Sequence, residues 1–414
     1  MNINNTKSKT TPLKSYDVIV IGGGIVGCSL AYLLSKDDKR VLVLDKQFIG
    51  SRQSGKAWGF IRKQLRNLQE IPMTSLAIEL WKSLAVELED DILWSNQGGI
   101  QLIENEQQLN DAKIWINQAE NFNLSTQIID ADTLRIKMPY LSTSVDSAIY
   151  TPDDGQVDPY KAVKALQKKA IKYNASFLEN ITYDHIDFDD EKFIFHTNKG
   201  NYLAEQVVCC AGAGSYFFLK RFNIVIPQLA ARVSSIKTAP LPLISKNTFL
   251  GGGIGFRQDK DGCITLGCQN ESDVDLTWRY LVHGNKFISN KKISRNDFSV
   301  NFSHIFKNES KKELIPIANF DHIHLAITRF NKLFPTIPQV EIQNFWAEYI
   351  DFLPNFNPII DRHPVMKNLV IATGFSGSGF ALGPAVGKLL SEILAFEQPS
   401  IDITNFRFPN QTRV

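Results

Sequence analysis

The stretch that decides the fold is residues 16–45, which read YDVIVIGGGIVGCSLAYLLSKDDKRVLVLD. It opens with an apolar run of strand length, Tyr16–Ile21, as expected for a parallel strand that is buried on both faces. A glycine-rich turn follows, and then a helical stretch at Cys28–Ser35 and a second apolar strand at Arg40–Leu44. This order of elements predicts the first βαβ unit of a Rossmann-like sheet.

Three glycines with the spacing G-x-G-x-x-G separate this strand from this helix: Gly22, Gly24 and Gly27. The first makes the tight turn, the second lets the backbone approach a pyrophosphate, and the third lets the helix pack on the strand. The free N–H groups of the helix start, at Ile25 and Val26, are expected to point at the phosphates. Asp45 ends the second strand, where an acidic side chain accepts hydrogen bonds from a ribose. Together these features predict a dinucleotide site, without distinguishing FAD from NAD.

Further α/β elements recur along the chain in separated blocks. The pattern predicts helices at 71–88, 160–172 and 384–395, strands at 206–210 and 369–372, and a glycine-rich loop at 373–383. Between about residues 225 and 345 strand patterns dominate, for example the alternating run Gly262–Gly267. We therefore expect an α/β (mixed α+β) fold, with a discontinuous Rossmann-like cofactor domain and an inserted antiparallel β-sheet substrate domain. The expected boundaries are a disordered leader at 1–15, a cofactor domain at 16–92, 155–218 and 345–414, and a substrate domain at 93–154 and 219–344.

Length and charge limit the functional class. The 414 residues suffice for one large domain or two interlocked ones, and 43% of them are apolar. With 45 basic and 43 acidic residues the net charge is +2, so no global field favours nucleic acid or a membrane surface. The largest local basic excess, at Lys286–Arg295, is expected to be a solvated surface segment. No apolar run approaches the roughly 18 residues that span a bilayer, and the polar first 15 residues do not form a secretory signal.

The chain has five cysteines and no C-x-x-C pair: Cys28, Cys209, Cys210, Cys263 and Cys268. An odd number of cysteines in apolar surroundings predicts reduced, buried thiols in a reducing compartment. The expected location is the cytoplasm, with a peripheral position at the inner face of the membrane as the alternative.

Nearly the whole chain, from about Tyr16 to Arg407, resembles the D-amino-acid oxidase-like superfamily of FAD enzymes. The likeness is strongest to the flavoprotein subunits of opine oxidase, D-hydroxyproline dehydrogenase and hydrogen cyanide synthase. Besides the glycine fingerprint, the motifs that carry it are Ser54-Gly55-Lys56, Gly59–Gln64, Gly155–Pro159, Phe256–Gln258 before Asp261-Gly262, Trp346-Ala347, Pro354, Pro358, and Gly374–Phe380 with Gly383-Pro384 and Gly387. In such proteins the Gly374–Phe380 block closes over the flavin ring, whereas NAD enzymes lack it, so the resemblance implies FAD.

The resemblance also implies that FAD is bound without a covalent link. Sarcosine-type oxidases attach flavin through a cysteine, and Glu348 stands at its place here. The residues expected to bind the cofactor are Gly22, Gly24, Ile25, Val26, Gly27, Asp45, Lys46, Ser54, Gly55, Lys56, Gly212, Trp346, Gly374, Ser376, Gly377, Ser378, Gly379 and Phe380.

For the chemistry, the resemblance implies that a hydride passes from the carbon beside a neutral amine to flavin N5, and that the resulting imine hydrolyses. Arg62 matches the arginine that anchors a substrate carboxylate in sarcosine oxidases. Ala381 stands where a lysine would complete that clamp, and Arg257 is the candidate replacement. Arg62, Arg257 and Glu348 form the expected catalytic set. Thr265 stands where a lysine promotes the reaction with oxygen, so a dehydrogenase is expected rather than an oxidase.

Several positions depart from the family pattern near the flavin: Ala57, Trp58, Phe60, Glu348, Asn355 and Ser378. Two alternatives to an amine dehydrogenase or oxidase therefore stay open. One is a FAD-binding assembly protein without turnover, and the other is a tRNA-modifying oxidoreductase of the same superfamily, which the missing basic stripe disfavours.

The expected partners are an amino-acid-like small molecule and, as in the similar flavoproteins, small iron–sulfur or ferredoxin-like subunits. No nucleic acid and no transmembrane segment are expected. His322 and His324 would share one face of a strand and could hold a metal, but a third ligand is missing and no metal is expected. His363 is expected in a turn.

Overall fold

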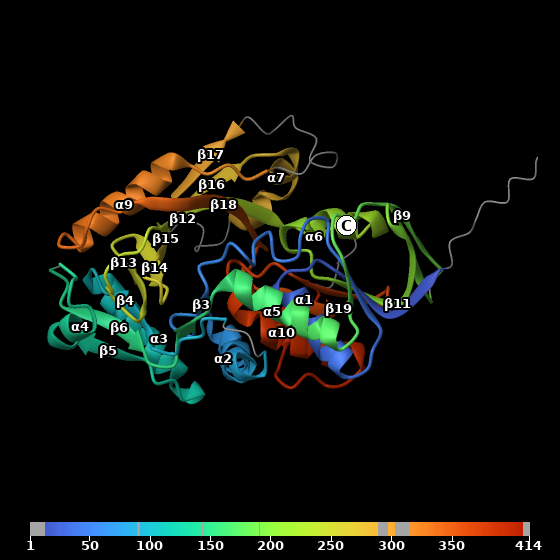
Figure 1. The fold of residues 1–414 in the computed structure, drawn as a ribbon, viewed down its shortest axis with the longest axis horizontal. Helices are drawn as coiled ribbons and strands as arrows, with labels where there is room; N and C mark the ends of the chain where they lie inside the picture. The colour runs from blue at the N-terminus through green and yellow to red at the C-terminus, as the bar shows by residue number, and fades with distance from the viewer. Residues whose placement is uncertain are drawn as a thin grey trace, which may run out of the picture.

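We describe the protein from a computed structural model, which covers residues 13–88, 92–142, 144–189, 191–288, 297–302 and 315–408. Within these residues the chain forms two large sheets that lie side by side, with helices packed on each (Figure 1). The expected mixed α/β class is confirmed. None of the described helices is long and apolar enough to cross a membrane.

The first sheet has a parallel centre, as the apolar run at residues 16–21 predicts. Its strands, in spatial order, are β19 (Ile359–Arg362), β20 (Leu369–Thr373), β11 (Gly200–Cys209), β1 (Lys14–Ile21), β2 (Val41–Leu44) and β8 (Ser176–Leu178). A meander of β9 (Tyr183–Phe188) and β10 (Phe193–Thr197) is added antiparallel to β11, and β19 is antiparallel to β20. The strands β1 and β2 are buried on both faces because helices cover one face and the meander covers the other.

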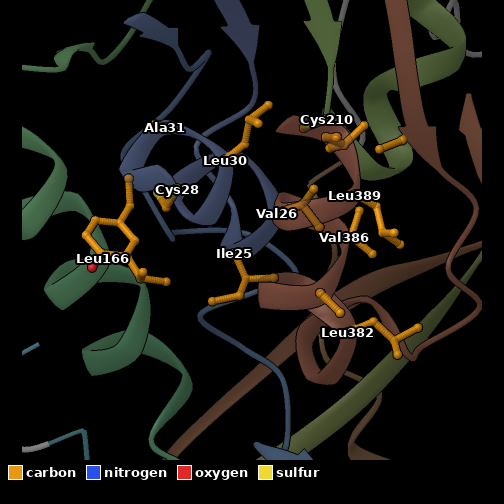
Figure 2. Close-up of a cluster of buried hydrophobic side chains, with 14 of the residues drawn as sticks. Ile25, Val26, Cys28, Leu30, Ala31, Leu166, Cys210, Leu382, Val386 and Leu389 are labelled. Atoms are coloured by element: carbon orange, nitrogen blue, oxygen red, sulfur yellow. The ribbon is translucent and has the colours of Figure 1, made fainter. Parts of the chain in front are cut away.

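Four helices cover one face of this sheet: α1 (Ile25–Lys36), α2 (Ile71–Glu87), α5 (Pro159–Lys172) and α10 (Gly379–Leu394). In Figure 2, Leu382, Val386 and Leu389 of α10 lie toward Ile25 and Val26 of α1. Gly383 allows this close approach, because a Cβ added there would come within 2.5 Å of Ile25. A short helix, α6 (Ser215–Leu219), packs on the opposite face.

The second sheet is mainly antiparallel, with parallel pairs only at β13/β4 and β16/β17 among the described strands. In spatial order its strands are β17 (Asp297–Asn301), β16 (Glu271–Asp275), β12 (Leu229–Thr238), β15 (Ile264–Cys268), β14 (Ile254–Gln258), β13 (Thr248–Gly251), β4 (Gly99–Leu102), β6 (Ser147–Thr151) and β5 (Gln127–Asp130), and β18 (Ile342–Phe352) pairs with β12. The helices around it are α3 (Glu106–Ala119), α4 (Ala131–Lys137), α7 (Trp278–His283), α8 (Asn285–Ile288) and α9 (Phe320–Leu333). A two-stranded ribbon, β3 (Phe60–Ile61) with β7 (Gly155–Gln156), lies between the sheets (Figure 1).

Some local predictions were wrong. The segment that carries His322 and His324 is helix α9, not a strand, because Ile323, Ala326 and Phe330 recur at helical spacing and pack on the second sheet. Two residues apart on a helix, the two imidazoles face different directions. The last helix begins at Gly379, five residues earlier than expected, and Pro384 lies inside it.

Other local predictions hold. The helices predicted at 71–88 and 160–172 are confirmed, and all five cysteines are free and buried. His363 lies in the connection between β19 and β20, as expected. The basic run at 286–295 extends outside the described residues. Residues 1–12 of the expected leader also lie outside them, while Lys14 and Ser15 already belong to β1.

The expected boundary at residue 345 falls inside β18, which is paired along its length with β12 of the second sheet. We propose that the cofactor-domain segment starts after Phe352, and that the other boundaries stay as predicted from the sequence.

Candidate functional site

One large cavity, of about 1050 Å³, lies where the loops of the first sheet meet the second sheet. Its wall includes the first turn of α1, the loop at residues 50–59, the turn after β11, the start of α10, and parts of β12, β16 and β18. Most of the residues expected to bind a cofactor line it: Gly22, Gly24, Ile25, Val26, Asp45, Lys46, Ser54, Lys56, Gly212, Ser376, Gly377, Gly379 and Phe380. Segments far apart in the sequence are therefore brought to one cavity, as the separated α/β blocks predict.

The glycine fingerprint has the geometry that its spacing predicts. Gly22 has a φ of 106°, in the region that favours glycine. Gly27 does not line the cavity, and its role is packing, because an added Cβ would lie 2.0 Å from the carbonyl oxygen of Gly22. Gly24 and the first residues of α1 form the cavity wall, so the positive end of the helix dipole faces the cavity.

Asp45 and Ser54 fix the loops around this helix start. The Asp45 carboxylate accepts hydrogen bonds of 2.7 Å from the N–H groups of Gly23 and Gln47. Burial raises the pKa of Asp45, and these two N–H donors lower it. Ser54 Oγ accepts a 2.9 Å hydrogen bond from the N–H of Ile25 and thus ties the 50–59 loop to α1.

A buried carboxylate that the sequence reasoning missed, Asp351, organises the glycine-rich loop before α10. Its Oδ2 accepts hydrogen bonds of 2.8 Å from the N–H of Gly374 and from Gln228 Nε2. Gln53 Nε2 donates to its other oxygen at 2.9 Å. Asp351 therefore joins the loop after β20 to the loop at 50–59. In the sequence, only its position three residues after Glu348, on the same strand, could have hinted at this role.

Glu348 lies on the cavity wall between two cations. Arg52 donates from Nε and Nη2 to its two carboxylate oxygens, at 3.0 and 2.9 Å, and Lys56 Nζ lies 3.1 Å from Oε2. Its side chain is almost fully buried, whereas Arg52 and Lys56 keep 28% and 30% of their side-chain exposure. With its oxygens paired in this way, Glu348 is suited to fixing the two cations rather than to abstracting a proton.

Arg62 follows β3 and lines the same cavity. Its Nη1 is buried and has no hydrogen-bond partner within the described residues. Burial lowers the pKa of Arg62 to about 10; the neighbouring charge of Arg66 acts in the same direction, and Asp154 opposes both. A buried guanidinium with an open donor is what the expected carboxylate anchor requires.

Arg257, the expected second cation, does not line the cavity. Its guanidinium is buried, forms an ion pair with Asp259 and donates to the carbonyl oxygen of Trp58. The structure thus holds it behind the 57–59 segment. The cation that does lie beside Arg62 is Arg66, which lines the cavity and which the sequence reasoning missed.

Besides Gly27, four expected cofactor residues support the cavity wall rather than form it: Gly55, Trp346, Gly374 and Ser378. Trp346 Nε1 donates to the carbonyl oxygen of Lys56 at 2.9 Å, and Ser378 accepts from Arg66. Trp58 lies on the second sheet: its Nε1 donates to Ser235 Oγ at 2.8 Å, and its ring covers Gly255 and Gly267.

The histidines that do share a face are His185 and His196, on β9 and β10. Their rings stack at 4.0 Å, and Asp187 lies 2.8 Å from His196 Nε2. This exposed group is the only one of three or more potential metal ligands found within the described residues, and none of its members lines the cavity.

Comparison with known proteins agrees with this site. A family model described as "DAO: FAD dependent oxidoreductase" matches residues 17–393. The chain is 24% identical over 396 residues to glycine oxidase of Bacillus subtilis (strain 168), covering 94% of this chain and 95% of that protein. L-amino acid deaminase from Proteus myxofaciens, solved in complex with anthranilate, has a TM-score of 0.88 and 23% identity, covering 97% of this chain and 94% of that chain. Glycine oxidase from Geobacillus kaustophilus has a TM-score of 0.81 and 20% identity, covering 96% of this chain and 99% of that chain.

These findings confirm the resemblance to the D-amino-acid oxidase-like superfamily. The finer likeness to opine oxidase, D-hydroxyproline dehydrogenase and hydrogen cyanide synthase subunits stays a prediction, as do the iron–sulfur or ferredoxin-like partners. One conclusion follows from three findings: the family match over residues 17–393, the cavity lined by the glycine fingerprint, and the relatives aligned along nearly their whole length. The chain belongs to the DAO family of FAD-dependent oxidoreductases, and its cofactor is FAD.

Proposed function

We propose that this protein oxidises the C–N bond of an amino acid or an amino-acid-like secondary amine, and that Arg62 binds the substrate carboxylate. The observation that carries the proposal is the buried Nη1 of Arg62, which has no protein partner in the described residues and belongs to the wall of the cavity that the cofactor fingerprint also lines. The glycine oxidase and L-amino acid deaminase that the chain resembles act, by their names, on substrates of this class.

The cavity residues fit FAD. At the helix start, Gly24 and Val26 would offer N–H groups to the pyrophosphate, whereas the N–H of Ile25 already donates to Ser54. Asp45 keeps lone pairs for a ribose, since a carboxylate accepts up to about four hydrogen bonds. Gly377, with a φ of 84°, gives the loop before α10 the backbone shape to pass close to a flat ring. Five expected cofactor residues would act on FAD only indirectly, by supporting the residues that line the cavity: Gly27, Gly55, Trp346, Gly374 and Ser378.

Bound FAD supplies the oxidation by accepting a hydride, and the protein supplies orientation. Arg62 would hold the carboxylate through two parallel N–H donors and so fix the neighbouring carbon relative to the flavin site. Trp58, Phe60 and Leu250 give the cavity an apolar wall, which excludes water and favours the neutral amine over the ammonium ion. Glu348 would keep Arg52 and Lys56 in place rather than take part in proton transfer.

The test is anaerobic bleaching of the flavin by a panel of D- and L-amino acids, N-methylated amino acids, prolines and opines. We expect at least one compound to bleach the 450 nm band of the flavoprotein. Arg62→Ala should weaken that substrate by about 1.5–3 kcal/mol, the loss of a charged hydrogen bond, and keep its FAD. Arg135→Ala, which removes an exposed cation on α4, serves as the control. An unchanged substrate affinity in Arg62→Ala would remove the assignment.

A second candidate is a FAD-binding assembly protein without turnover. Two aromatic rings, of Trp58 and Phe60, line the cavity where the family has small residues. The cavity that these rings leave has a volume of about 1050 Å³ for cofactor and substrate together, at the upper end of ligand cavities, roughly 300–1,000 Å³. If FAD stays bound and no compound of the panel bleaches it, the assembly protein becomes the better description.

A further inference from the structure

Arg62 lies beside a second arginine, Arg66, on the cavity wall. Arg62 and Arg66 both line the cavity, and in the described part of the chain no carboxylate forms an ion pair with either guanidinium. Of the other arginines on the cavity wall, Arg52 is paired with Glu348, and Arg221 and Arg279 lie over the rings of Tyr183 and Tyr216. The pair is therefore a local excess of positive charge at one place on the wall.

The backbone is shaped to bring Arg66 back toward Arg62. Leu65 has a φ of 52°, a left-handed conformation that costs a branched residue about 1–2 kcal/mol. The turn is held by the Arg66 N–H, which donates to the Lys63 carbonyl at 3.2 Å, and by Trp115 Nε1, which donates to the Arg66 carbonyl at 2.7 Å. As a result Arg66 Nε donates to the carbonyl oxygen of Arg62 at 3.3 Å. Strain that is maintained at a cavity wall is typical of positioning for function.

The two side chains are not equivalent. Arg62 has an open Nη1, whereas Arg66 reaches across to the start of α10, where it donates to Ser378. Ala381, the position where the family's second cation is expected, is one helical turn from Ser378 and also lines the cavity. Arg66 thus brings a positive charge to the region of residue 381 from a different element of the fold.

The protein itself compensates these charges only in part. Two buried carboxyls that do not line the cavity act on them: the charge of Glu70 acts on Arg66, and the charge of Asp154 acts on both guanidinium groups. Burial raises the pKa of Asp154 to about 7, so it carries only part of a negative charge at neutral pH. Burial also lowers the pKa of Arg66. Neither guanidinium is in ion-pair contact with these acids in the described part of the chain, so the two desolvated cations can still take anionic groups from a ligand.

We infer that Arg62 and Arg66 bind two different carboxylates of one substrate, so that the amine this protein oxidises is a dicarboxylate: an amino dicarboxylic acid, or a secondary amine with a carboxylate on each side of the nitrogen. Arg62 holds the carboxylate beside the reacting carbon, and Arg66 holds the distal one near the start of α10. The inference rests on the proposed function and names its substrate class.

The test uses ligands that cannot be oxidised as amines. Methylthioacetate has one carboxylate and thiodiglycolate has two, with sulfur in place of the amine nitrogen. Each is titrated into the FAD-loaded protein, and binding is read from the perturbation of the flavin spectrum. We expect thiodiglycolate to bind the unaltered protein at least tenfold more tightly than methylthioacetate. Arg66→Met should weaken thiodiglycolate on the order of ten- to hundredfold, as for a charged hydrogen bond lost, and change methylthioacetate by less than about twofold.

Three controls keep the outcome decisive. Lys63→Met removes a cation of the same segment that does not line the cavity, and it should change neither ligand. Arg66→Lys should restore part of the thiodiglycolate affinity. FAD content and thermal unfolding show that each variant is folded.

Equal weakening of both ligands in Arg66→Met would overturn the inference, because the two arginines would then share one carboxylate. Unchanged affinity for both would also overturn it, and Arg66 would be a structural residue. Neither result depends on turnover. If thiodiglycolate is preferred but no amine bleaches the flavin, the proposed function fails while the dicarboxylate site stands.

Discussion

The buried carboxylate of Glu348 accepts two hydrogen bonds from the guanidinium of Arg52, at 3.0 and 2.9 Å, at the wall of the FAD cavity. Glu348→Ala would leave Arg52 and Lys56 without their acid. We expect the free energy of unfolding to fall by about 1.5–3 kcal/mol, and Glu348→Gln to cost less because an amide oxygen still accepts one bond. Urea unfolding measures both. The matched control is Asp132→Ala, which breaks the exposed pair with Arg135 and should cost little; equal losses in both would mean that the cavity pair has no special weight.

The hydrogen bond between Trp58 and Ser235 should be measurable as a coupling. Trp58→Phe removes the donor, Ser235→Ala removes the acceptor, and the double variant removes both. We expect a coupling of about 0.5–1.5 kcal/mol in the free energy of unfolding, the usual net value of such a bond. Strictly additive losses would show that the indole is held by its contacts with Gly255 and Gly267 alone.

The buried carboxyl of Asp154 should make stability depend on pH. Its pKa is raised from 3.8 to about 7 by burial, so between these values the folded chain keeps a proton that the unfolded chain has released. Stability should therefore fall as pH rises, by about 1.4 kcal/mol for each pH unit between about 4 and about 7. Asp154→Asn should remove this slope in urea unfolding at pH 5 and pH 7. Asp153→Asn, at a neighbouring half-exposed acid whose pKa is lowered, should keep it; a slope retained in Asp154→Asn would refute the assignment.

FAD should be released completely on denaturation. Glu348 stands where sarcosine-type oxidases have a cysteine for covalent attachment. The cavity is also lined by Cys210 and Cys268, and burial raises the pKa of both thiols, that of Cys268 to about 11. Since the thiolate is the nucleophile, neither is reactive at neutral pH. Acid precipitation should leave a colourless pellet, and yellow colour in the pellet would contradict this.

The reduced flavin should react slowly with oxygen. Thr265, at the place of the lysine in sarcosine-type oxidases, is buried and does not line the cavity. The cations opposite it on the neighbouring strands, Lys237 and Arg257, are both paired with Asp259, which offsets their charge. A fixed cation would stabilise developing superoxide in a dry site. After anaerobic reduction with dithionite, air should reoxidise the flavin about as slowly as free flavin, and a quinone quickly.

Thr265→Lys should accelerate the reaction with oxygen if this explanation holds. Fast reoxidation of the unaltered protein, with little further change in Thr265→Lys, would show that another cation does this work.

The sequence by itself determined the first sheet and the cofactor end of the cavity. Strand runs buried on both faces, the turn at Gly22 and the packing contact at Gly27 are local requirements of backbone geometry, so spacing along the chain reveals them. Arg62, which lines the cavity, was singled out through the resemblance to sarcosine-type oxidases and not through spacing alone.

Tertiary structure alone decided which other charges reach the cavity. Arg257 looked suitable by its place in a motif, but its pairing with Asp259 turns it away, whereas Arg66 arrives through a left-handed residue at position 65 and a contact with Ser378 more than 300 residues distant. The misread helix α9 has the same origin, since its apolar face is defined by the second sheet on which it packs. The direction of a side chain depends on packing and ion pairing with residues that are distant in sequence. Local periodicity therefore does not predict it.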